Sequence, residues 1–344
     1  MNKLLTIIVP TYNMENYLHR CLDSLLIDYP MFQQLEVLVI NDGSTDNSSI
    51  IAHEYEKKYP GIYRVIDKKN GNYGSCINCA LLEAKGRYVK ILDADDWFGD
   101  EFVDYIKNLR SLDVDMVVSD YQIFDQKRGN LHHVKFSLKP YTIIHFQELS
   151  SCDYYFAMHA ITYRTELLRK MNYHQTEGIS YTDTEWAFCP QIKVDTFVYL
   201  PYMVYHYLIG RSGQTMESRV IVKHVTDYYK LLCSMTLYTH TLSSKEQQNP
   251  SYKRMKNELS RICFSIYRIC LVKQNDSDFN ISFFCEFDGY VKREHPEAYM
   301  NSDKLIINKF FPIHYVRYWR ICGKRFPVDK LRQLYRFIRY GRVN

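Results

Sequence analysis

The chain has 344 residues, of which 46% are hydrophobic and 24% charged, and its net charge is +5. This is the composition of a globular protein, with room for one large domain and a smaller second one. No apolar run approaches the ~20 residues of a membrane-spanning helix, and the N-terminus has no signal-peptide pattern. The ten cysteines follow no disulfide or zinc spacing, so we expect reduced thiols in a cytoplasmic protein.

The first 120 residues alternate between short apolar runs and segments with helical periodicity. The runs predict strands at 4–9, 35–40, 63–66, 88–92 and 115–119, and the segments between them predict helices at about 17–26, 46–58, 74–84 and 100–110. Strands separated by helices of this length form βαβ units, and strands that are apolar throughout are buried on both faces. The predicted fold class is α/β, a mostly parallel sheet flanked by helices.

Beyond residue 120 the alternation weakens, with strand-like pieces at 141–146 and 196–207 and a helical pattern at 183–193. From about residue 216 the pattern is helical, at 220–238, 253–271 and 282–293. We therefore predict an α/β domain over 1–215 and a helical C-terminal region over 216–344.

Ligands of open parallel sheets bind beyond the carboxyl ends of the strands, and four successive strand ends are polar here. No Gly-x-Gly-x-x-Gly follows the first strand, and no phosphate-binding Gly-x-x-x-x-Gly-Lys-Ser/Thr loop occurs. A bound diphosphate would then need a cation, which two carboxylates two residues apart, Asp93 and Asp95, can hold; oxygen ligands favour Mg²⁺ or Mn²⁺. The third acid of that turn, Asp96, has a purely structural alternative as a helix cap. The four polar turns are PTYN at 10–13, NDGSTD at 41–46, DKKNGNYG at 67–74 and DADD at 93–96.

The PTYN tip, the VINDGSTDNS turn, the NGNYGSCIN loop and LDADDW together resemble the family-2 glycosyltransferases of the GT-A fold, of the kind that builds bacterial surface polysaccharides. The resemblance covers about residues 3–215 and implies a nucleotide-sugar-binding half at 1–120 and an acceptor half at 121–215. It implies that Asp95 holds Mn²⁺ or Mg²⁺ and that Asp93 contacts the metal or the ribose. It also implies that Tyr12 stacks on the nucleotide base and that Asp42 accepts a hydrogen bond from that base. The implied nucleotide-sugar-binding residues are Pro10, Thr11, Tyr12, Asp42, Lys69 (or its neighbour Lys68), Asn70, Asp93, Ala94 and Asp95.

The family also places a general base at the start of a helix in the acceptor half. The matching segment, GISYTDTEW at 178–186, implies that Asp183 takes the proton of the acceptor hydroxyl in one inverting displacement. Glu185 is the second candidate, and a helix cap is the structural alternative for Asp183. The chain departs from many relatives at Ile77-Asn78, where they carry Arg-Asn, and Lys90 or Arg211 could replace the missing cation. The roles of His206 and of the Arg211–Gln214 loop are left open.

Residues 304–344 contain eleven Lys or Arg, nine aromatic residues and a single acid, Asp329. A basic aromatic segment of this kind suits contact with anionic lipid, a packed helical subdomain or nucleic acid; we favour the first and expect no nucleic acid partner. A peripheral contact with the inner face of the plasma membrane is therefore expected.

The expected function is that of an inverting, metal-dependent glycosyltransferase of the hexosyltransferase type. It would move a sugar from a nucleotide sugar, with UDP favoured, to a glycan or lipid-linked acceptor. A sugar-nucleotide transferase and an inactive sugar-nucleotide-binding protein of the same fold are the alternatives. The donor sugar, the acceptor, the linkage and the oligomeric state are left open.

Overall fold

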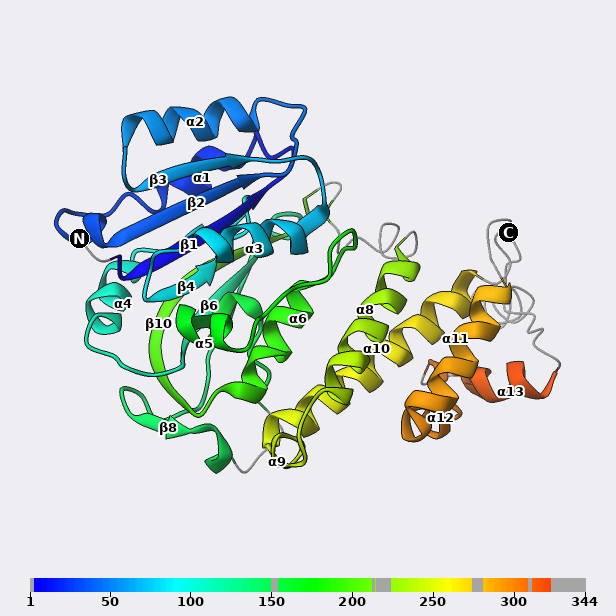
Figure 1. Cartoon of the computed structure of the whole chain (residues 1–344). Coiled ribbons are helices and arrows are strands. Elements are labelled where there is room, and N and C mark those ends of the chain that lie inside the picture. The colour runs from blue at the N-terminus through cyan, green and yellow to red at the C-terminus, as the bar shows by residue number, and fades with distance from the viewer. Residues whose placement is uncertain are drawn as a thin grey trace. The chain divides into compact units, whose positions relative to one another are not determined.

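The structure is a computed structural model that describes residues 3–149, 154–211, 214, 224–273, 281–308 and 311–322 (Figure 1). It divides into two compact units, the first formed by Met1–Glu217 and Leu242–Met255, the second by Ser218–Thr241 and Lys256–Asn344. The predicted domain boundaries at 120 and 215 stay predictions, because compactness in space does not measure independent folding. Within the described residues, no helix combines the length and apolar character that a membrane crossing requires.

The first unit is built on one ten-stranded sheet, whose main path has the order β3-β2-β1-β4-β9-β6-β10-β5. Its pairings place β1–β4, β6 and β10 in one direction, and β5, β7, β8 and β9 in the other. The expected α/β class with a mostly parallel sheet is thereby confirmed. The strands are β1 (Leu5–Thr11), β2 (Leu35–Asn41), β3 (Tyr63–Asp67), β4 (Tyr88–Ile91), β5 (Trp97–Phe98), β6 (Met116–Asp125), β7 (Asn130–Val134), β8 (Ile143–His145), β9 (Ile161–Arg164) and β10 (Thr196–Ile209).

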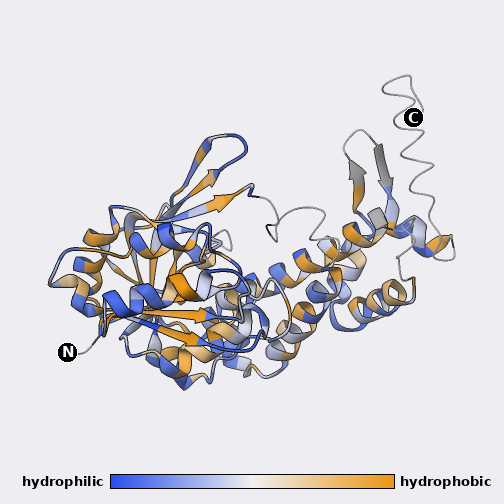
Figure 2. Cartoon of the chain, turned by 90° about the horizontal axis from the view of Figure 1, so that it is seen from above, coloured by the Kyte–Doolittle hydropathy of each residue, from blue (hydrophilic) through white to orange (hydrophobic). Residues whose placement is uncertain are grey.

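The core of this unit follows from the apolar strands, which Figure 2 shows as orange arrows inside it. Every residue of β2 and β4 is buried, since helices cover both faces of the sheet. α2 packs on β2 and β3, and α3 on β1 and β2. The helices are α1 (Leu18–Asp23), α2 (Ser48–Lys58), α3 (Asn72–Glu83), α4 (Phe102–Leu109), α5 (Thr165–Lys170), α6 (Asp183–Phe188) and α9 (Ser244–Gln247), with 3₁₀ turns at Met31–Gln34, Phe146–Glu148, Met158–Ala160 and Pro190–Lys193.

The second unit is mainly helical, as the sequence predicts. Its core contains buried apolar side chains such as Leu231, Phe287 and Trp319, and Arg320 donates hydrogen bonds to Asp288 and Asp303. Of the basic tail predicted at 304–344, residues 309–310 and 323–344 lie outside the described residues. The elements are α8 (Val225–His240), α10 (Pro250–Lys273), which starts in the first unit, α11 (Ile281–Glu294), α12 (Pro296–Ser302), β11 (Ile306–Asn308), β12 (Phe311–His314) and α13 (Tyr315–Ile321).

Candidate functional site

A cavity of about 290 Å³ lies at the carboxyl ends of β1, β2 and β4, where the sequence places the site. All the predicted site residues line it except Lys69, which is exposed and outside it; the binding role of Lys69 stays a prediction. The predicted residues in the lining are Pro10, Thr11, Tyr12, Asp42, Asn70, Asp93, Ala94, Asp95 and Asp183.

The end of the cavity at β1 and β2 contains a carboxylate held in a fixed orientation. Asp42 is 3% exposed, and its Oδ1 accepts hydrogen bonds from Lys68 Nζ at 2.6 Å and from the backbone N–H of Gly71 at 2.9 Å. Asn70 Nδ2 donates to the backbone oxygen of Asp42 at 3.0 Å. Tyr12, the residue after β1, is 47% exposed. Lys68 is thus the lysine that orders this end of the cavity.

The tip of β4 carries the acid Asp93, whose Oδ1 accepts a hydrogen bond from Tyr73 at 2.8 Å. Burial, together with the nearby Asp95 carboxylate, raises the pKa of Asp93 to about 8. A cation bound beside this carboxyl would favour its charged form.

The second acid of the turn, Asp95, has an arginine partner. Arg211 Nε donates to Asp95 Oδ2, and Arg20 donates to the backbone oxygen of Asp95 at 2.7 Å. Arg211 also lines the cavity and lies over the Tyr17 ring, with 5.5 Å from the guanidinium carbon to the ring centre. Arg211 therefore brings a cation to the cavity wall, and its replacement of the arginine that many relatives carry stays a prediction.

Lys90, the other suggested substitute, is fully buried and outside the cavity lining. Its ammonium donates to the backbone oxygens of His159 at 2.7 Å and Ile161 at 3.2 Å, and burial lowers its pKa to about 7. Lys90 holds β4 to the segment entering β9, so its suggested role near the donor is wrong.

The third acid, Asp96, joins the tip of β4 to β10. Its Oδ2 accepts a hydrogen bond from the Tyr205 hydroxyl at 2.6 Å, and its Oδ1 accepts one from the backbone N–H of Leu208 at 2.7 Å. The residue at the N-cap of α4 is Glu101. The helix-cap alternative for Asp96 is therefore wrong. Burial and the carboxylates of Asp95 and Asp93 raise the pKa of Asp96 well above its usual range.

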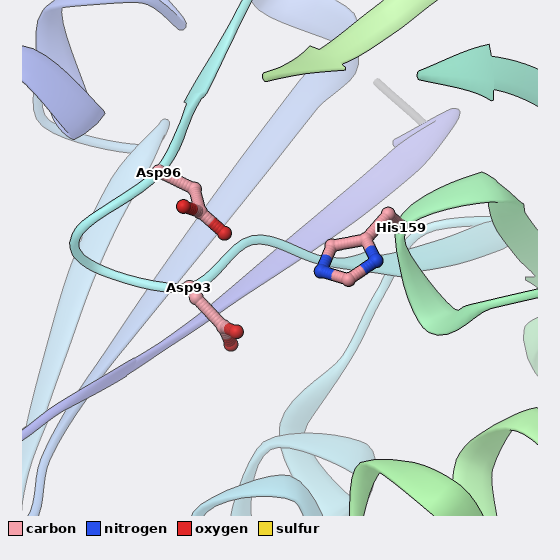
Figure 3. A group of neighbouring side chains, drawn as sticks. All are labelled: Asp93, Asp96 and His159. Atoms are coloured by element: carbon pink, nitrogen blue, oxygen red, sulfur yellow. The ribbon is translucent and has the colours of Figure 1, made fainter. Parts of the chain in front are cut away.

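A possible metal-ligand set lies beside these acids. Asp93, Asp96 and His159 carry ligand atoms that lie within 4.8 Å of one another, and Figure 3 shows the two carboxylates and the ring facing a common space. The Nδ1 atom of His159 is buried without a hydrogen-bond partner, and burial lowers the pKa of this ring to about 3. A neutral imidazole beside carboxylates is a donor set that suits Mn²⁺. The residues present thus fit a divalent cation, and the metal roles of Asp93 and Asp95 stay predictions.

Asp183 enters the cavity as the first residue of α6. It is exposed, and the residue at the N-cap of this helix is Thr182, so Asp183 is not the cap. Glu185, in contrast, is 3% exposed, and its carboxylate accepts hydrogen bonds from the Thr176 N–H and hydroxyl, both at 2.7 Å. The geometry therefore favours Asp183 over Glu185 as the base.

Several lining residues received no individual role in the sequence analysis, although most of them fall within the quoted motifs at 67–74 and 178–186. Three tyrosines lie in the cavity wall in addition to Tyr12: Tyr73 and Tyr181, which fall within quoted motifs, and Tyr207. His206, whose role the sequence leaves open, packs edge-on against Trp97 with 5.3 Å between ring centres. The lining residues that the sequence did not single out are Met14, Asn72, Tyr73, Cys76, His159, Ile179, Ser180, Tyr181, Thr182 and Tyr207.

Comparison with known proteins agrees with this geometry. Residues 6–171 match the family model described as Glycosyl transferase family 2. The uncharacterized glycosyltransferase MG025 homolog of Mycoplasma pneumoniae is 44% identical over 97 residues, which are 28% of this chain and 32% of that protein. The minor teichoic acid biosynthesis protein GgaB of Bacillus subtilis is 38% identical over 91 residues, 26% of this chain and 10% of that protein. The chain spans less than half the length of these curated relatives.

Two solved structures share the fold. The crystal structure of S. aureus TarS 1-349 in complex with UDP-GlcNAc has a TM-score of 0.64 at 19% identity, and the match covers 98% of this chain and 92% of that one. The mannosyltransferase PcManGT from Pyrobaculum calidifontis, in complex with GDP-Man and Mn²⁺, has a TM-score of 0.51 at 16% identity, with 86% and 82% covered. Residues 6–171 match glycosyltransferase family 2, and the chain has the GT-A fold.

Proposed function

We propose that this protein is an inverting, metal-dependent glycosyltransferase that moves a sugar from a UDP-sugar to a glycan or lipid-linked acceptor. The observation that carries the proposal is the composition of one cavity wall. It combines three parts: a fixed carboxylate to bind the nucleotide base (Asp42), acids and an arginine to bind the diphosphate (Asp93, Asp95 and Arg211), and an exposed carboxylate to accept the proton of the acceptor hydroxyl (Asp183). A transferase of this type needs all three.

Recognition of the nucleotide base is assigned to Asp42 and Tyr12. Lys68 and Gly71 both donate to Oδ1 of Asp42, which fixes how the carboxylate meets the cavity, and a uracil ring N–H can donate to it. The exposed Tyr12 ring offers a stacking face for the base. The UDP-GlcNAc complex of TarS, a protein of the same fold with the higher TM-score of the two, supports uracil as the base.

The reaction is a single displacement at C1 of the sugar. The acceptor hydroxyl oxygen attacks C1 while the bond from C1 to the β-phosphate oxygen breaks, and its electron pair leaves with UDP. Asp183 accepts the hydroxyl proton, and attack from the face opposite the leaving group inverts C1. Arg211, which lines the cavity, can donate hydrogen bonds to the phosphate oxygens.

Mn²⁺ or Mg²⁺ is the proposed cofactor, held by Asp93 and Asp95; His159 and Asp96 have ligand atoms within 4.8 Å of those of Asp93. When bound, the metal neutralises negative charge that develops on the leaving diphosphate. The Mn²⁺ complex of PcManGT supports this assignment. Asp95→Ala should abolish Mn²⁺-dependent UDP binding, measured by titration calorimetry. Binding that survives this change would remove Asp95 from the metal site.

The two alternatives are a sugar-nucleotide transferase and an inactive binding protein. A sugar-nucleotide transferase normally has a Gly- and Lys-rich loop after the first strand, where this chain has Pro10-Thr11-Tyr12. An inactive protein would not need the exposed Asp183, which lines the cavity here. Both observations favour the glycosyltransferase.

The acceptor is proposed to be a surface or capsular polysaccharide precursor on the cytoplasmic side of the membrane. The name of GgaB, which assigns that relative to teichoic acid synthesis, supports a surface polymer. The basic segment 304–344 is proposed to make a peripheral membrane contact. Deleting this segment should shift the protein from the membrane fraction to the soluble fraction of a cell lysate. Unchanged partitioning would refute this part of the proposal.

The central test is a screen of nucleoside diphosphate release from UDP-, GDP- and dTDP-sugars with Mn²⁺, followed by Asp183→Asn with the active donor. We expect the variant to bind donor with unchanged affinity and to lose turnover by a factor on the order of 10³. Normal turnover by Asp183→Asn would place the base elsewhere, and the absence of any donor turnover would favour a binding protein.

A further inference from the structure

We infer that Asn78 of α3 is a positioning residue that holds Asp183 in place for proton transfer. Asn78 does not line the cavity; it acts through the segment 174–178, which leads into α6. The inference rests on the proposed function, in which Asp183 is the base.

The side-chain amide of Asn78 makes hydrogen bonds with both the N–H and the carbonyl oxygen of the Gln175 backbone. The Gln175 N–H donates to Asn78 Oδ1 at 2.8 Å, and Asn78 Nδ2 donates to the Gln175 backbone oxygen at 2.9 Å. Nδ2 also donates to Glu177 Oε1 at 2.8 Å. An amide that both donates to and accepts from one residue fixes the position and the orientation of that backbone, which alanine cannot do.

The same face of α3 contacts this segment at two further points. Gly71, the N-cap residue of α3, and Gly74 and Asn78 within the helix recur at helical spacing, so they lie on the same side of it. The Gly178 N–H donates to the Gly71 backbone oxygen at 3.0 Å, and a Cβ atom on Gly74 would lie only 2.2 Å from the backbone oxygen of Thr176. Successive turns of α3 therefore contact the backbone of 175–178 directly.

The segment is also tied to α6. Both carboxylate oxygens of Glu185 accept from Thr176, at 2.7 Å each, and Glu185 lies two residues beyond Asp183. A chain of contacts thus runs from Asn78 through residues 175–176 to the first turn of α6. A side chain at the start of that turn moves with the segment that Asn78 holds.

α3 holds the donor side of the cavity as well. Its residue Tyr73 donates to Asp93 Oδ1 at 2.8 Å, five residues before Asn78. One helix therefore contacts both Asp93, at the diphosphate end of the cavity, and the segment that leads to the proposed general base, Asp183. The distance between Asp93 and Asp183 is set through α3, and a small displacement of a reacting group can cost ~100-fold in rate.

The test compares Asn78→Ala with Asn108→Ala in the full-length protein. Asn108 also donates two hydrogen bonds at 2.9 Å, to the Asp104 backbone oxygen and the Tyr202 hydroxyl, in the same unit but outside the cavity lining. We expect Asn78→Ala to lower kcat by roughly 10- to 100-fold, with the KM for the donor and the affinity for UDP within about twofold. Asn108→Ala should leave all of them within about twofold. A parallel loss of UDP affinity in Asn78→Ala would overturn the inference, since it would mean general damage to the cavity.

The decisive measurement is a double-mutant cycle with Asp183→Asn. If Asn78 acts through Asp183, Asn78→Ala lowers the residual rate of Asp183→Asn by no more than about twofold. An equal loss in both backgrounds would overturn the inference. Wild-type turnover by Asp183→Asn alone would instead refute the proposed function, so the two failures are distinguishable. Glu185→Gln disturbs the same segment from α6 and takes the place of Asn78→Ala in the cycle if that variant does not fold.

Discussion

Lys90 of β4 has a fully buried ammonium group, and replacing it with methionine should change how the stability of the first unit depends on pH. Its Nζ donates only to backbone oxygens among the described contacts, those of His159 and Ile161. Burial lowers the pKa of Lys90 from 10.5 to about 7. The folded state therefore disfavours the protonated lysine relative to the unfolded state.

The direction of the pH effect follows from this difference. Between pH 7 and pH 10.5 the unfolded state binds more protons than the folded state, so the free energy of unfolding rises with pH in that window. A shift of one pKa unit corresponds to a free energy of ~1.4 kcal/mol, so burying the charged amine destabilises the folded state by about 5 kcal/mol below pH 7. About 2 kcal/mol of this cost is relieved between pH 7 and pH 9. Lys90→Met binds no proton there and lacks this rise.

Urea unfolding at pH 7, 8 and 9 with a reductant measures the effect. Trp97 and Trp186 belong to the first unit, so both variants are studied in a Trp319→Phe background in which fluorescence reports that unit. The control is Lys107→Met in α4, where the lysine side chain is 57% exposed and its removal should leave the pH slope unchanged. If the curves for Lys90 and Lys90→Met run parallel between pH 7 and pH 9, the argument from burial is refuted.

Three further predictions concern the acids at the tip of β4. A metal ligand must be deprotonated, and the pKa of Asp93 is raised to about 8. The affinity for Mn²⁺, measured by titration calorimetry, should therefore rise by up to about tenfold per pH unit from pH 6 to pH 8 and then level off. An affinity that does not change with pH would contradict Asp93 as a ligand. His159→Ala should weaken Mn²⁺ binding at least about tenfold, and equal affinity would exclude the ring from the metal site. Tyr205→Phe leaves Asp96 without its hydroxyl donor and should destabilise the first unit by about 1–3 kcal/mol in urea unfolding.

Local patterns in the sequence predicted the strands that precede the cavity, because each is a continuous apolar run followed by a polar turn. They did not predict β9, which is only four residues long and lies antiparallel between β4 and β6. Its sequence, ITYR, forms no continuous apolar run, and the partners of β9 are far from it in the chain. The predicted path from β4 to β6 therefore lacked the strand that separates them.

The residues of the site fall into those that the sequence could identify and those that it could not. The family resemblance supplied Asp42, Asp93, Asp95 and Asp183, since each belongs to a motif. The contacts that orient such residues join positions far apart in the chain, as Asn78 and Gln175 do, and leave no local signal. The cap interpretation of Asp96 failed for this reason: its partner Tyr205 is 109 positions away.

The three acids at the tip of β4 are tolerated together because each has a different partner. Asp96 accepts from two groups of β10, Asp95 has the Arg211 guanidinium, and Asp93 accepts only a hydroxyl among the described contacts. Asp93 is thus the acid that gains most from a divalent cation, which would replace the proton that its burial favours. A metal that also binds Asp95 must share that carboxylate with Arg211. In the proposed function a bound diphosphate would relieve this competition, because its oxygens could accept hydrogen bonds from the Arg211 guanidinium and leave the Asp95 carboxylate for the metal. Metal and donor should therefore bind cooperatively, with Arg211 exchanging a carboxylate for phosphate.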